Sequence, residues 1–328
     1  MIVRWGLDAL PGVLEQLSVG DPLLISTERW RATELPLDLP AHRRFHGVQP
    51  HAEVAGVREA LAAADGADGL IALGGGSAID TAKAVSSETG LPIVSMPTTY
   101  SGAEWTQGFG TRDREAGIKR GGGGARTAAI VYVPELTLDL PTDQSAGTAM
   151  NALAHCAEAL YTAGRSDETD DEALAGARLI SAWLPRVVQQ PGDLGARTNL
   201  LEGAMHAGAA LRAGMGLGHA MAQALGGRYG LAHGTMNAVS LPPALRYNRE
   251  IAGEAIARLG EAIARPDDPI ARVAELAVLA GPPRLRDYGV PRQDLGPLSE
   301  AIAERAPARN NPRPAPAKAV LTVLEEIW

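Results

Sequence analysis

Three histidines lie in or just after helical segments rich in small residues, where their ring nitrogens could hold a metal ion or move protons. In AMNALAHCAEALY, positions 149–161, Asn151 and His155 are four residues apart and share one helix face. His219 and His233 stand fourteen residues apart in GLGHAMAQALGGRYGLAHGTMNAVSLP, positions 216–242, with an expected turn at Gly226–Gly227. The three imidazoles could converge from three segments. The alternative is that each is a hydrogen-bonded histidine of the core.

The other histidines and the single cysteine have no comparable setting. We expect His42, His46, His51 and His206 to be surface or packing residues. Cys156 excludes an internal disulfide and a zinc site built from cysteines, and we expect a small core residue rather than a nucleophile.

The segment GGGSAID, positions 74–80, follows an apolar run and opens a helical pattern. Backbone N–H groups of such a loop, together with the helix N-terminus, can cradle a pyrophosphate, and glycines let the phosphate approach closely. We therefore expect a dinucleotide cofactor to bind here and to contact Gly74, Gly75, Gly76, Ser77 and Asp80. Ser77 should also cap the helix. A purely structural glycine turn remains the alternative, because the G-x-G-x-x-G spacing is absent.

A second candidate loop, MPTTYSGAE at positions 96–104, follows the next apolar run. Ligands of parallel sheets bind at the carboxyl ends of strands, so Thr98 and Thr99 should face the same crevice as the glycines. A local turn stabilised by these hydroxyls is the alternative. Glu28 ends the earlier run PLLISTE, where a carboxylate could bind an adenosine ribose and repel a 2′-phosphate, which weakly favours NAD(H) over NADP(H).

Alternation of short apolar runs with helical patterns positions these loops. The runs at 22–27, 69–73, 92–96 and 128–133 predict strands of a parallel sheet, and Gly90 should end the helix that follows GGGSAID. From about residue 143 the pattern is helical, and we expect helices at 143–163, 168–189, 197–212, 216–226, 251–264, 268–281, 294–304 and 315–327. We predict an α/β domain over 1–142 and an α-helical domain over 143–328. Thr142 or Asp143 would cap the first helix of the second domain.

The length, the composition and the net charge narrow the class of protein. The 328 residues suit two domains or one large one, and aromatic residues make up only 4%, so small side chains must do most of the packing. The net charge of −8 includes no basic block, which argues against a nucleic-acid partner. We find neither a signal-peptide pattern nor a long apolar stretch, and expect a cytoplasmic protein with no membrane partner. The glycine run Gly121–Gly124 and the proline-rich segment 309–319 resemble linkers.

Seven stretches, in order, resemble the iron-containing (group III) alcohol dehydrogenase superfamily: GGGSAID, PTTYSGAE, PELTLDLP, MNALAHCAEALY, GLGHAMAQALGG, LAHGTMNAVSLP and NPRPAPAKAVLTVLEEIW. The resemblance spans nearly the whole chain. Within this superfamily the sequence is most similar to the maleylacetate reductases, because of PTTYSGAE, the Asn of MNALAH and the NPRP before the last helix. It implies an α/β nucleotide-binding domain followed by an all-α domain, the dehydroquinate synthase-like fold, with the active site in the cleft between them.

The resemblance also implies a metal site that is incomplete here. Metal-dependent members bind iron or zinc through one Asp and three His, and those positions correspond to Asn151, His155, His219 and His233. Since a neutral amide is a poor ligand for either metal, we expect metal affinity to fall. A further active-site histidine found in many members is replaced by Gln223. If a metal is bound at all, the three histidines would hold it.

We therefore expect an NAD(P)H-dependent reductase of a small carboxylated carbonyl or enone, such as maleylacetate, which would become 3-oxoadipate. The catalytic residues would be Asn151, His155, His219 and His233, and one histidine would donate the proton. Candidate substrate contacts are Tyr100, Gln223 and Arg246, with Arg212 and Tyr161 as further possibilities.

Two alternatives stay open, and a homodimer is expected in each case. The first is an iron- or zinc-dependent alcohol or aldehyde oxidoreductase of a specialised pathway. The second is a non-catalytic nucleotide-binding protein in which the changes at Asn151 and Gln223 have abolished the chemistry.

Overall fold

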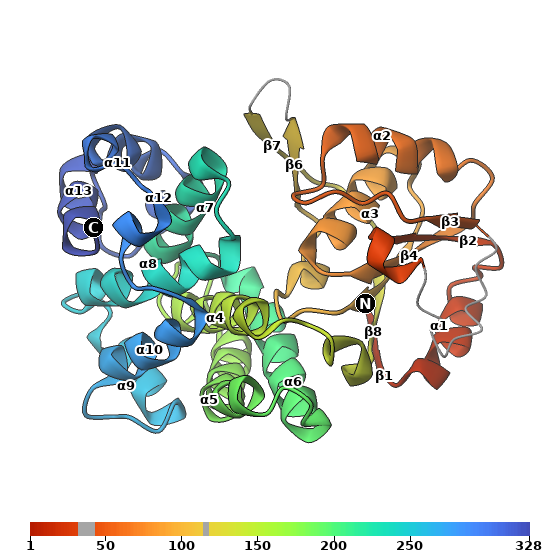
Figure 1. Cartoon of the computed structure of the whole chain (residues 1–328). Helices are drawn as coiled ribbons and strands as arrows, with labels where there is room; N and C mark the ends of the chain where they lie inside the picture. Colours follow the sequence, from red (N-terminus) through yellow and green to blue (C-terminus); the bar gives the residue numbers. More distant parts are fainter. Residues whose placement is uncertain (32–42, 114–117) are drawn as a thin grey trace. The chain divides into compact units, whose positions relative to one another are not determined.

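The computed structural model describes residues 1–31, 43–113 and 118–328 (Figure 1). The chain divides into two compact units, Met1–Asp139 and Leu140–Trp328, slightly before the boundary predicted at 142 and 143. His42, expected to be a surface or packing residue, lies outside the described residues. No helix in the described chain combines the length and the apolar character that crossing a membrane requires.

The first unit is built on a six-stranded parallel sheet with the order β1-β8-β5-β4-β2-β3. The strands are β1 (Ile2–Trp5), β2 (Pro22–Ser26), β3 (Arg43–Phe45), β4 (Gly69–Gly74), β5 (Ile93–Pro97) and β8 (Thr127–Tyr132). Four of them confirm the predicted strands. The edge strands β1 and β3 were not predicted, because they are short and each contains arginine.

Side chains at alternate positions of each strand enter separate cores on the two faces of the sheet. Leu24 and Ile71 pack with α1 (Leu10–Gln16), whereas Leu23 and Leu70 pack with α2 (Val54–Ala63) and α3 (Gly76–Thr89). In Figure 1, α2 and α3 accordingly lie on one face and α1 on the other. The inner strands are therefore buried on both faces, which is why they appear in the sequence as continuous apolar runs.

Helix α3 begins two residues earlier than its predicted cap requires. Gly75 is the N-cap residue and Ser77 lies inside the first turn, so the prediction that Ser77 caps the helix was wrong. A side chain at position 75 has no room, since its Cβ would lie 2.7 Å from Thr99 Cγ2. Gly90 ends α3 in the left-handed conformation with φ 72°, as predicted.

The glycine run is not a linker. Gly121 and Gly122 belong to β7 (Ile118–Gly122), which pairs in antiparallel fashion with β6 (Phe109–Asp113). The Phe109 ring lies against Gly122 where a Cβ would stand, so a side chain at this position would have to displace the ring.

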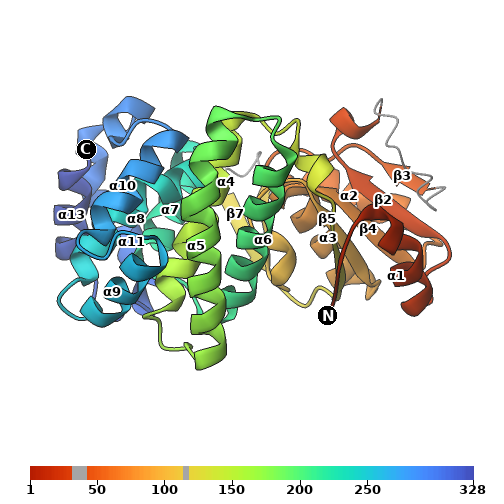
Figure 2. The same ribbon diagram turned by 90° about the horizontal axis from the view of Figure 1, so that it is seen from below.

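The second unit is entirely helical. Its helices are α4 (Thr142–Ala159), α5 (Asp167–Gln189), α6 (Leu194–Ala210), α7 (Leu217–Tyr229), α8 (His233–Asn248), α9 (Gly253–Ala262), α10 (Pro269–Ala277), α11 (Leu295–Ala303), α12 (Ala306–Arg309) and α13 (Ala317–Glu326). Figure 2 shows α4, α5 and α6 side by side. All eight predicted helices are present. Helix α4 is capped at Pro141 without a side-chain hydrogen bond, so neither Thr142 nor Asp143 acts as predicted.

Helix α8 was not predicted, because Pro242 and Pro243 lie within it. A proline inside a helix costs about 3 kcal/mol through a lost hydrogen bond and a steric clash. Leu241 and Leu245 are fully buried, and each such side chain contributes about 1.5–3 kcal/mol. Burial therefore offsets much of the cost of the prolines, and the helix continues to Asn248.

Helix α7 likewise continues through the turn predicted at Gly226–Gly227. It ends at Gly230, which is left-handed with φ 70°.

Candidate active site

The glycine loop forms a cradle for an anion at the carboxyl end of β4. Helix α3 starts there without any side chain capping its first N–H groups, so these groups remain available as donors. Gly74 has φ 149°, a conformation that side chains rarely adopt, and a Cβ at Gly75 would meet Thr99. These features fit the pyrophosphate of a dinucleotide.

The threonine loop lies beside this cradle, as predicted, because β5 is the neighbour of β4 in the sheet. The Thr98 N–H donates to the Gly74 carbonyl at 3.1 Å and ties the two loops together. Thr98 is nearly buried, and the Thr99 hydroxyl donates to Ser101 Oγ at 3.3 Å. Thr99 is therefore the more accessible of the two.

Ser77 and Asp80 have structural partners in addition to any role toward a cofactor. Ser77 Oγ accepts the backbone N–H of His51 at 3.0 Å. Asp80 accepts the N–H of Gly110 at 3.2 Å and lies 3.6 Å from the buried Lys83 ammonium. These contacts connect α3 with the β6–β7 hairpin and with the segment before α2.

Glu28 lies just beyond β2, the strand next to the one that leads into the glycine loop. Strand β2 is the neighbour of β4, and the chain leaves these strands in opposite directions, toward β3 and toward β5. Such a switch point is where open parallel sheets bind their ligands. The Glu28 carboxylate is exposed and pairs with Arg31 at 2.5 Å.

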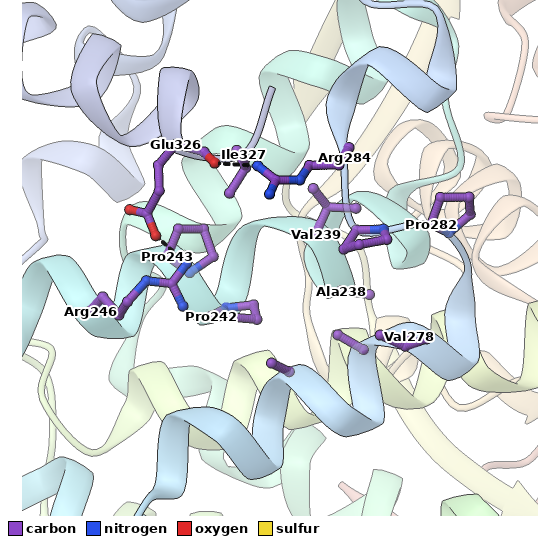
Figure 3. A pocket seen from close by; sticks show the side chains of 13 residues that line it. Ala238, Val239, Pro242, Pro243, Arg246, Val278, Pro282, Arg284, Glu326 and Ile327 are labelled. Carbon is purple, nitrogen blue, oxygen red and sulfur yellow. Dashed lines mark hydrogen bonds and ion pairs between the residues drawn. The ribbon is translucent and has the colours of Figure 1, made fainter.

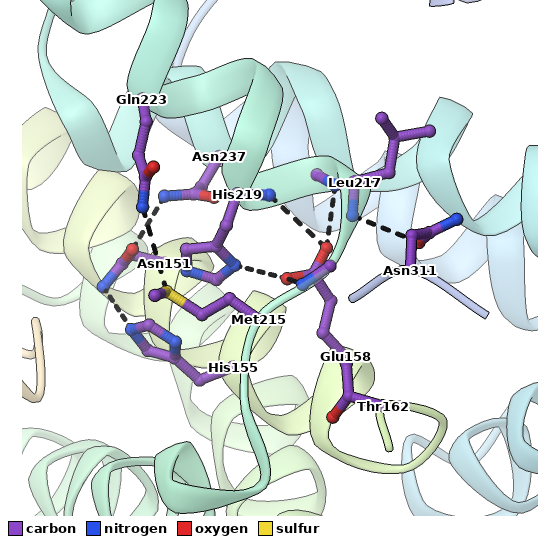
Figure 4. A network of polar contacts seen from close by, with 12 residues as sticks. Asn151, His155, Glu158, Thr162, Met215, Leu217, His219, Gln223, Asn237 and Asn311 are labelled. Carbon is purple, nitrogen blue, oxygen red and sulfur yellow. Dashed lines mark hydrogen bonds and ion pairs between the residues drawn. The ribbon is translucent and has the colours of Figure 1, made fainter. Parts of the chain in front are cut away.

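The three predicted histidines come together within the helical unit (Figure 4). His155 on α4 and His219 on α7 are stacked, with ring centroids 4.3 Å apart and an interplanar angle of 21°. His233, the first residue of α8, has its ring centroid 6.0 Å from that of His219. His155 and His219 are buried, whereas His233 is partly exposed and is the histidine of the cluster that an incoming molecule can contact most directly.

The close approach of α4 and α8 positions this histidine cluster. A Cβ on Gly234 would lie 2.5 Å from the carbonyl carbon of Gly147, so α8 begins directly against the backbone of α4. Gly147 lies one turn before Asn151, and Gly234 follows His233. The two glycines thus bring Asn151 and His233 together.

Glu158 fixes the position of His219 from the far end of α4. Its buried carboxylate accepts His219 Nδ1–H at 2.6 Å and the backbone N–H groups of Gly216 and Gly218 at 2.7 and 2.8 Å. Because Nδ1–H donates to Glu158, a neutral His219 ring carries its hydrogen on Nδ1. Its other nitrogen, Nε2, is then an acceptor. Sequence reasoning missed Glu158, although it follows His155 by three residues in the same motif.

Two amides connect the other histidines. Asn151 Nδ2 lies 3.1 Å from His155 Nε2, and Asn151 Oδ1 accepts from Asn237 Nδ2 at 2.7 Å. Asn237 Nδ2 also lies 3.1 Å from His233 Nε2. Sequence reasoning missed Asn237 as well, because α8 itself was not predicted.

The ring geometry does not fit a divalent cation shared by the three histidines. Zinc and iron require nitrogen lone pairs that converge on one point at about 2.0–2.1 Å. The lone pairs of each ring lie in its plane, so the stacked, nearly parallel planes of His155 and His219 do not meet at a point close to both rings unless one side chain rotates. Within residues 1–31, 43–113 and 118–328, no group of three or more His, Cys, Asp or Glu side chains is arranged to hold a metal ion. The carboxylate–histidine contact of Glu158 with His219 is nevertheless typical of metal sites.

Gln223 follows His219 by one turn of α7 and lies beside the cluster, as Figure 4 shows. Its Nε2 is 4.0 Å from Met215 Sδ, a weak contact that leaves the amide able to turn toward a ligand.

Arg246 does not belong to the site. It lies about 20 Å along α8 from His233, at 1.5 Å per residue. At 100° per residue, its side chain projects from nearly the opposite side of the helix. There it pairs with Glu326 at 2.6 Å on a separate pocket of about 310 Å³ (Figure 3). The prediction that Arg246 binds substrate was therefore wrong.

The other distant candidates are also occupied elsewhere. Tyr100 is fully buried in the first unit, and its hydroxyl donates to Thr137 Oγ1 at 3.4 Å, so its predicted contact with substrate is not supported. Arg212 pairs with Glu168 at 2.5 Å. Tyr161 is buried, as is Cys156, whose thiol pKa is raised by burial, in agreement with a packing residue.

Comparisons with known proteins identify the family of this chain. Residues 8–133 match the family "Iron-containing alcohol dehydrogenase", and residues 145–328 match "Fe-containing alcohol dehydrogenase family, C-terminal". A maleylacetate reductase of Burkholderia cepacia is 38% identical over 80% of this chain and 74% of its own length. That of Pseudomonas knackmussii is 35% identical over 98% and 93%. The crystal structure of the maleylacetate reductase from Agrobacterium tumefaciens is 30% identical, covers 100% of this chain and 95% of its own, and superposes with a TM-score of 0.89. The chain is an oxidoreductase that belongs to the iron-containing alcohol dehydrogenase family and has that family's fold.

Proposed function

We propose that the protein is a reductase that uses NAD(P)H to convert maleylacetate, or a closely similar unsaturated keto diacid, to the saturated keto acid without a metal ion. The observation that carries the proposal is the histidine cluster linked by neutral amides, with Asn151 where metal-dependent relatives have a carboxylate. The maleylacetate reductases among its relatives supply the substrate class.

In this reaction the reduced nicotinamide, when bound, supplies a hydride to the carbon β to the ketone. The protein must then stabilise negative charge on the ketone oxygen and deliver one proton to the α carbon. His233 is suited to both tasks, because it is partly exposed and stands at the N-terminus of α8, where the helix dipole favours negative charge. His155 and His219 support it from the buried side of the cluster.

The charge at position 151 favours an anionic substrate. Two negative charges 4 Å apart repel by about 4 kcal/mol at the effective dielectric constant of a protein surface. An amide at Asn151 removes that repulsion from a substrate that carries two carboxylates. The same change removes the anionic ligand that a metal-dependent reaction would need.

A second candidate function is a metal-dependent alcohol or aldehyde oxidoreductase, and the Glu158–His219 contact favours it. Histidines that ligate metals usually donate their second ring N–H to a carboxylate, as His219 does here. Metal analysis of the purified protein separates the two functions. A stoichiometric iron or zinc whose removal abolishes turnover would refute the metal-free proposal.

The decisive experiment follows oxidation of NADH and NADPH with maleylacetate, saturated keto acids and simple aldehydes, each with and without a chelator. We expect turnover with maleylacetate that the chelator leaves unchanged. Cofactor binding without turnover on any compound would instead support a non-catalytic protein. Replacing Asn151 by Asp should raise zinc or iron affinity by completing the four-ligand set, and no gain would show that our explanation of Asn151 is wrong.

Preference between the two cofactors should be modest. Glu28 can bind the ribose hydroxyls, but Arg31 neutralises part of its charge. We expect NADH to be preferred weakly, and replacing Glu28 by Gln should bring the kcat/KM values for NADH and NADPH closer together.

A further inference from the structure

Asn237 is a fully buried amide that lies between the two outer histidines of the cluster. It follows His233 by one turn of α8. Its Nδ2 atom lies within hydrogen-bonding distance of three acceptors: the His233 backbone carbonyl at 3.2 Å, His233 Nε2 at 3.1 Å and Asn151 Oδ1 at 2.7 Å.

The backbone carbonyl determines which way each amide points. A carbonyl oxygen only accepts hydrogen bonds, so the Asn237 atom facing it must be the nitrogen. The Asn151 atom 2.7 Å from that nitrogen must then be the oxygen, because two amide nitrogens would repel. Asn151 consequently turns its own N–H toward His155 Nε2, which must accept. One main-chain oxygen thus orients two amides and, through them, His155.

The geometry points to Asn237 as a positioning residue for the reaction proposed above. It donates one amide hydrogen to Asn151 Oδ1 and shares the other between the carbonyl and Nε2 of His233, and so keeps the Nε2 atoms of His155 and His233 as acceptors. In the neutral state both rings then carry their hydrogen on Nδ1. His233 delivers a proton only as the imidazolium, since a neutral ring would have to become an imidazolate. Asn151 presents an N–H rather than an oxygen to His155.

Helix α8 offers a matched control. Asn248 is also a buried asparagine of α8 and forms a reciprocal amide pair with Asn311, at 2.9 and 2.7 Å, outside the histidine cluster. Replacing Asn237 or Asn248 by Ala removes a buried amide in each case. Only the first replacement removes hydrogen bonds to residues of the cluster.

We expect Asn237→Ala to lower kcat about 10- to 100-fold, the usual effect of losing a partner that orients an active-site ligand or base. The substrate KM should change less than about threefold, and the stoichiometry of NADH binding should stay at one per chain, because the cradle lies in the other unit. Asn248→Ala should lower Tm by a similar amount and leave kcat within about threefold. Equal losses of kcat in the two variants would overturn the inference.

Histidine tautomers provide a readout that needs no activity. In protein labelled with ¹⁵N-histidine, Nε2 of His155 and His233 should resonate as unprotonated ring nitrogens, with single histidine variants giving the assignment. Asn237→Asp replaces the donor by a carboxylate, so Asn151 should turn its N–H toward it and present its oxygen to His155. His155 must then carry its hydrogen on Nε2.

This reversal of the His155 signal is the expected result, and an unchanged tautomer in Asn237→Asp would refute the role of Asn237. If the wild-type protein reduces no compound of the panel, the proposed function fails, while the tautomer measurement still decides the role of Asn237. The two failures are therefore distinguishable.

Discussion

Replacing Glu158 by Gln tests how the buried carboxylate positions His219. In the wild-type protein it accepts His219 Nδ1–H and the N–H groups of Gly216 and Gly218, and it is fully shielded from solvent. The amide oxygen of glutamine can keep two of these contacts by facing Gly216 and His219. Its NH2 group must then face the N–H of Gly218, a donor facing a donor.

The cost follows from these contacts. A hydrogen bond to a charged group is worth about 1.5–3 kcal/mol, and the strong bond from Gly218 is lost together with a weak one from the His219 backbone N–H at 3.4 Å. The two that remain become neutral and fall to roughly half their strength. We therefore expect a loss of about 3–5 kcal/mol, or about 10 °C in Tm for a unit of this size. Because His219 also loses its anionic partner, kcat should fall about 10- to 100-fold.

Calorimetric unfolding and steady-state kinetics measure the two effects, and Glu172 supplies the control. Its carboxylate contacts His206 Nδ1 at 2.6 Å, the same distance as in the Glu158 pair, but both side chains are partly exposed. Glu172→Gln should cost less than about 1 kcal/mol and leave kcat unchanged. A Glu158→Gln variant as stable as Glu172→Gln would refute the argument that burial and the backbone N–H groups make the Glu158 contacts strong.

Three further predictions follow from the helical unit. Gly234→Ala should destabilise the helical unit by about 1–3 kcal/mol and lower kcat, because the new Cβ meets the backbone of α4. The control is Gly253→Ala, which should change Tm little because the space around its Cβ is open. His219→Ala and His233→Ala should each lower kcat by at least about 100-fold through loss of acid–base chemistry. Burial raises the pKa of Asp170, but hydrogen bonds from two arginines outweigh it and leave the pKa below its ordinary value, so this carboxylate stabilises the fold at neutral pH. Asp170→Asn should cost about 2 kcal/mol at pH 7, between the values for exposed and buried pairs.

Each prediction has an outcome that contradicts it. Equal Tm values for Gly234→Ala and Gly253→Ala would show that α4 and α8 are not in close contact. Near-normal rates in both histidine variants would remove the cluster from the mechanism. For Asp170, whose partners are Arg165 and Arg258 at 2.7 and 2.5 Å, the stability difference should persist above the ordinary pKa of Asp and disappear as pH falls through the lowered value. A difference that does not vary with pH would contradict the ion-pair explanation.

Local signals in the sequence determined the glycine cradle, the threonine loop and the three histidines. Gly75 and Gly76 permit a close main-chain approach, and a parallel sheet places the ends of neighbouring strands at one edge. The helical spacing put Asn151 and His155 on one face of α4. Such features depend on neighbours in sequence, so a single chain is enough to predict them.

The other features of the site depend on tertiary contacts, which only the structure shows. Helix α8 persists through two prolines because its leucines are buried, and only that helix brings Asn237 to Asn151 and His233. The side of α8 from which Arg246 projects removes it from the site, and the core of the first unit encloses Tyr100. The direction of the Asn151 amide is set by the His233 carbonyl, which belongs to another helix, so no local pattern around position 151 could have shown it.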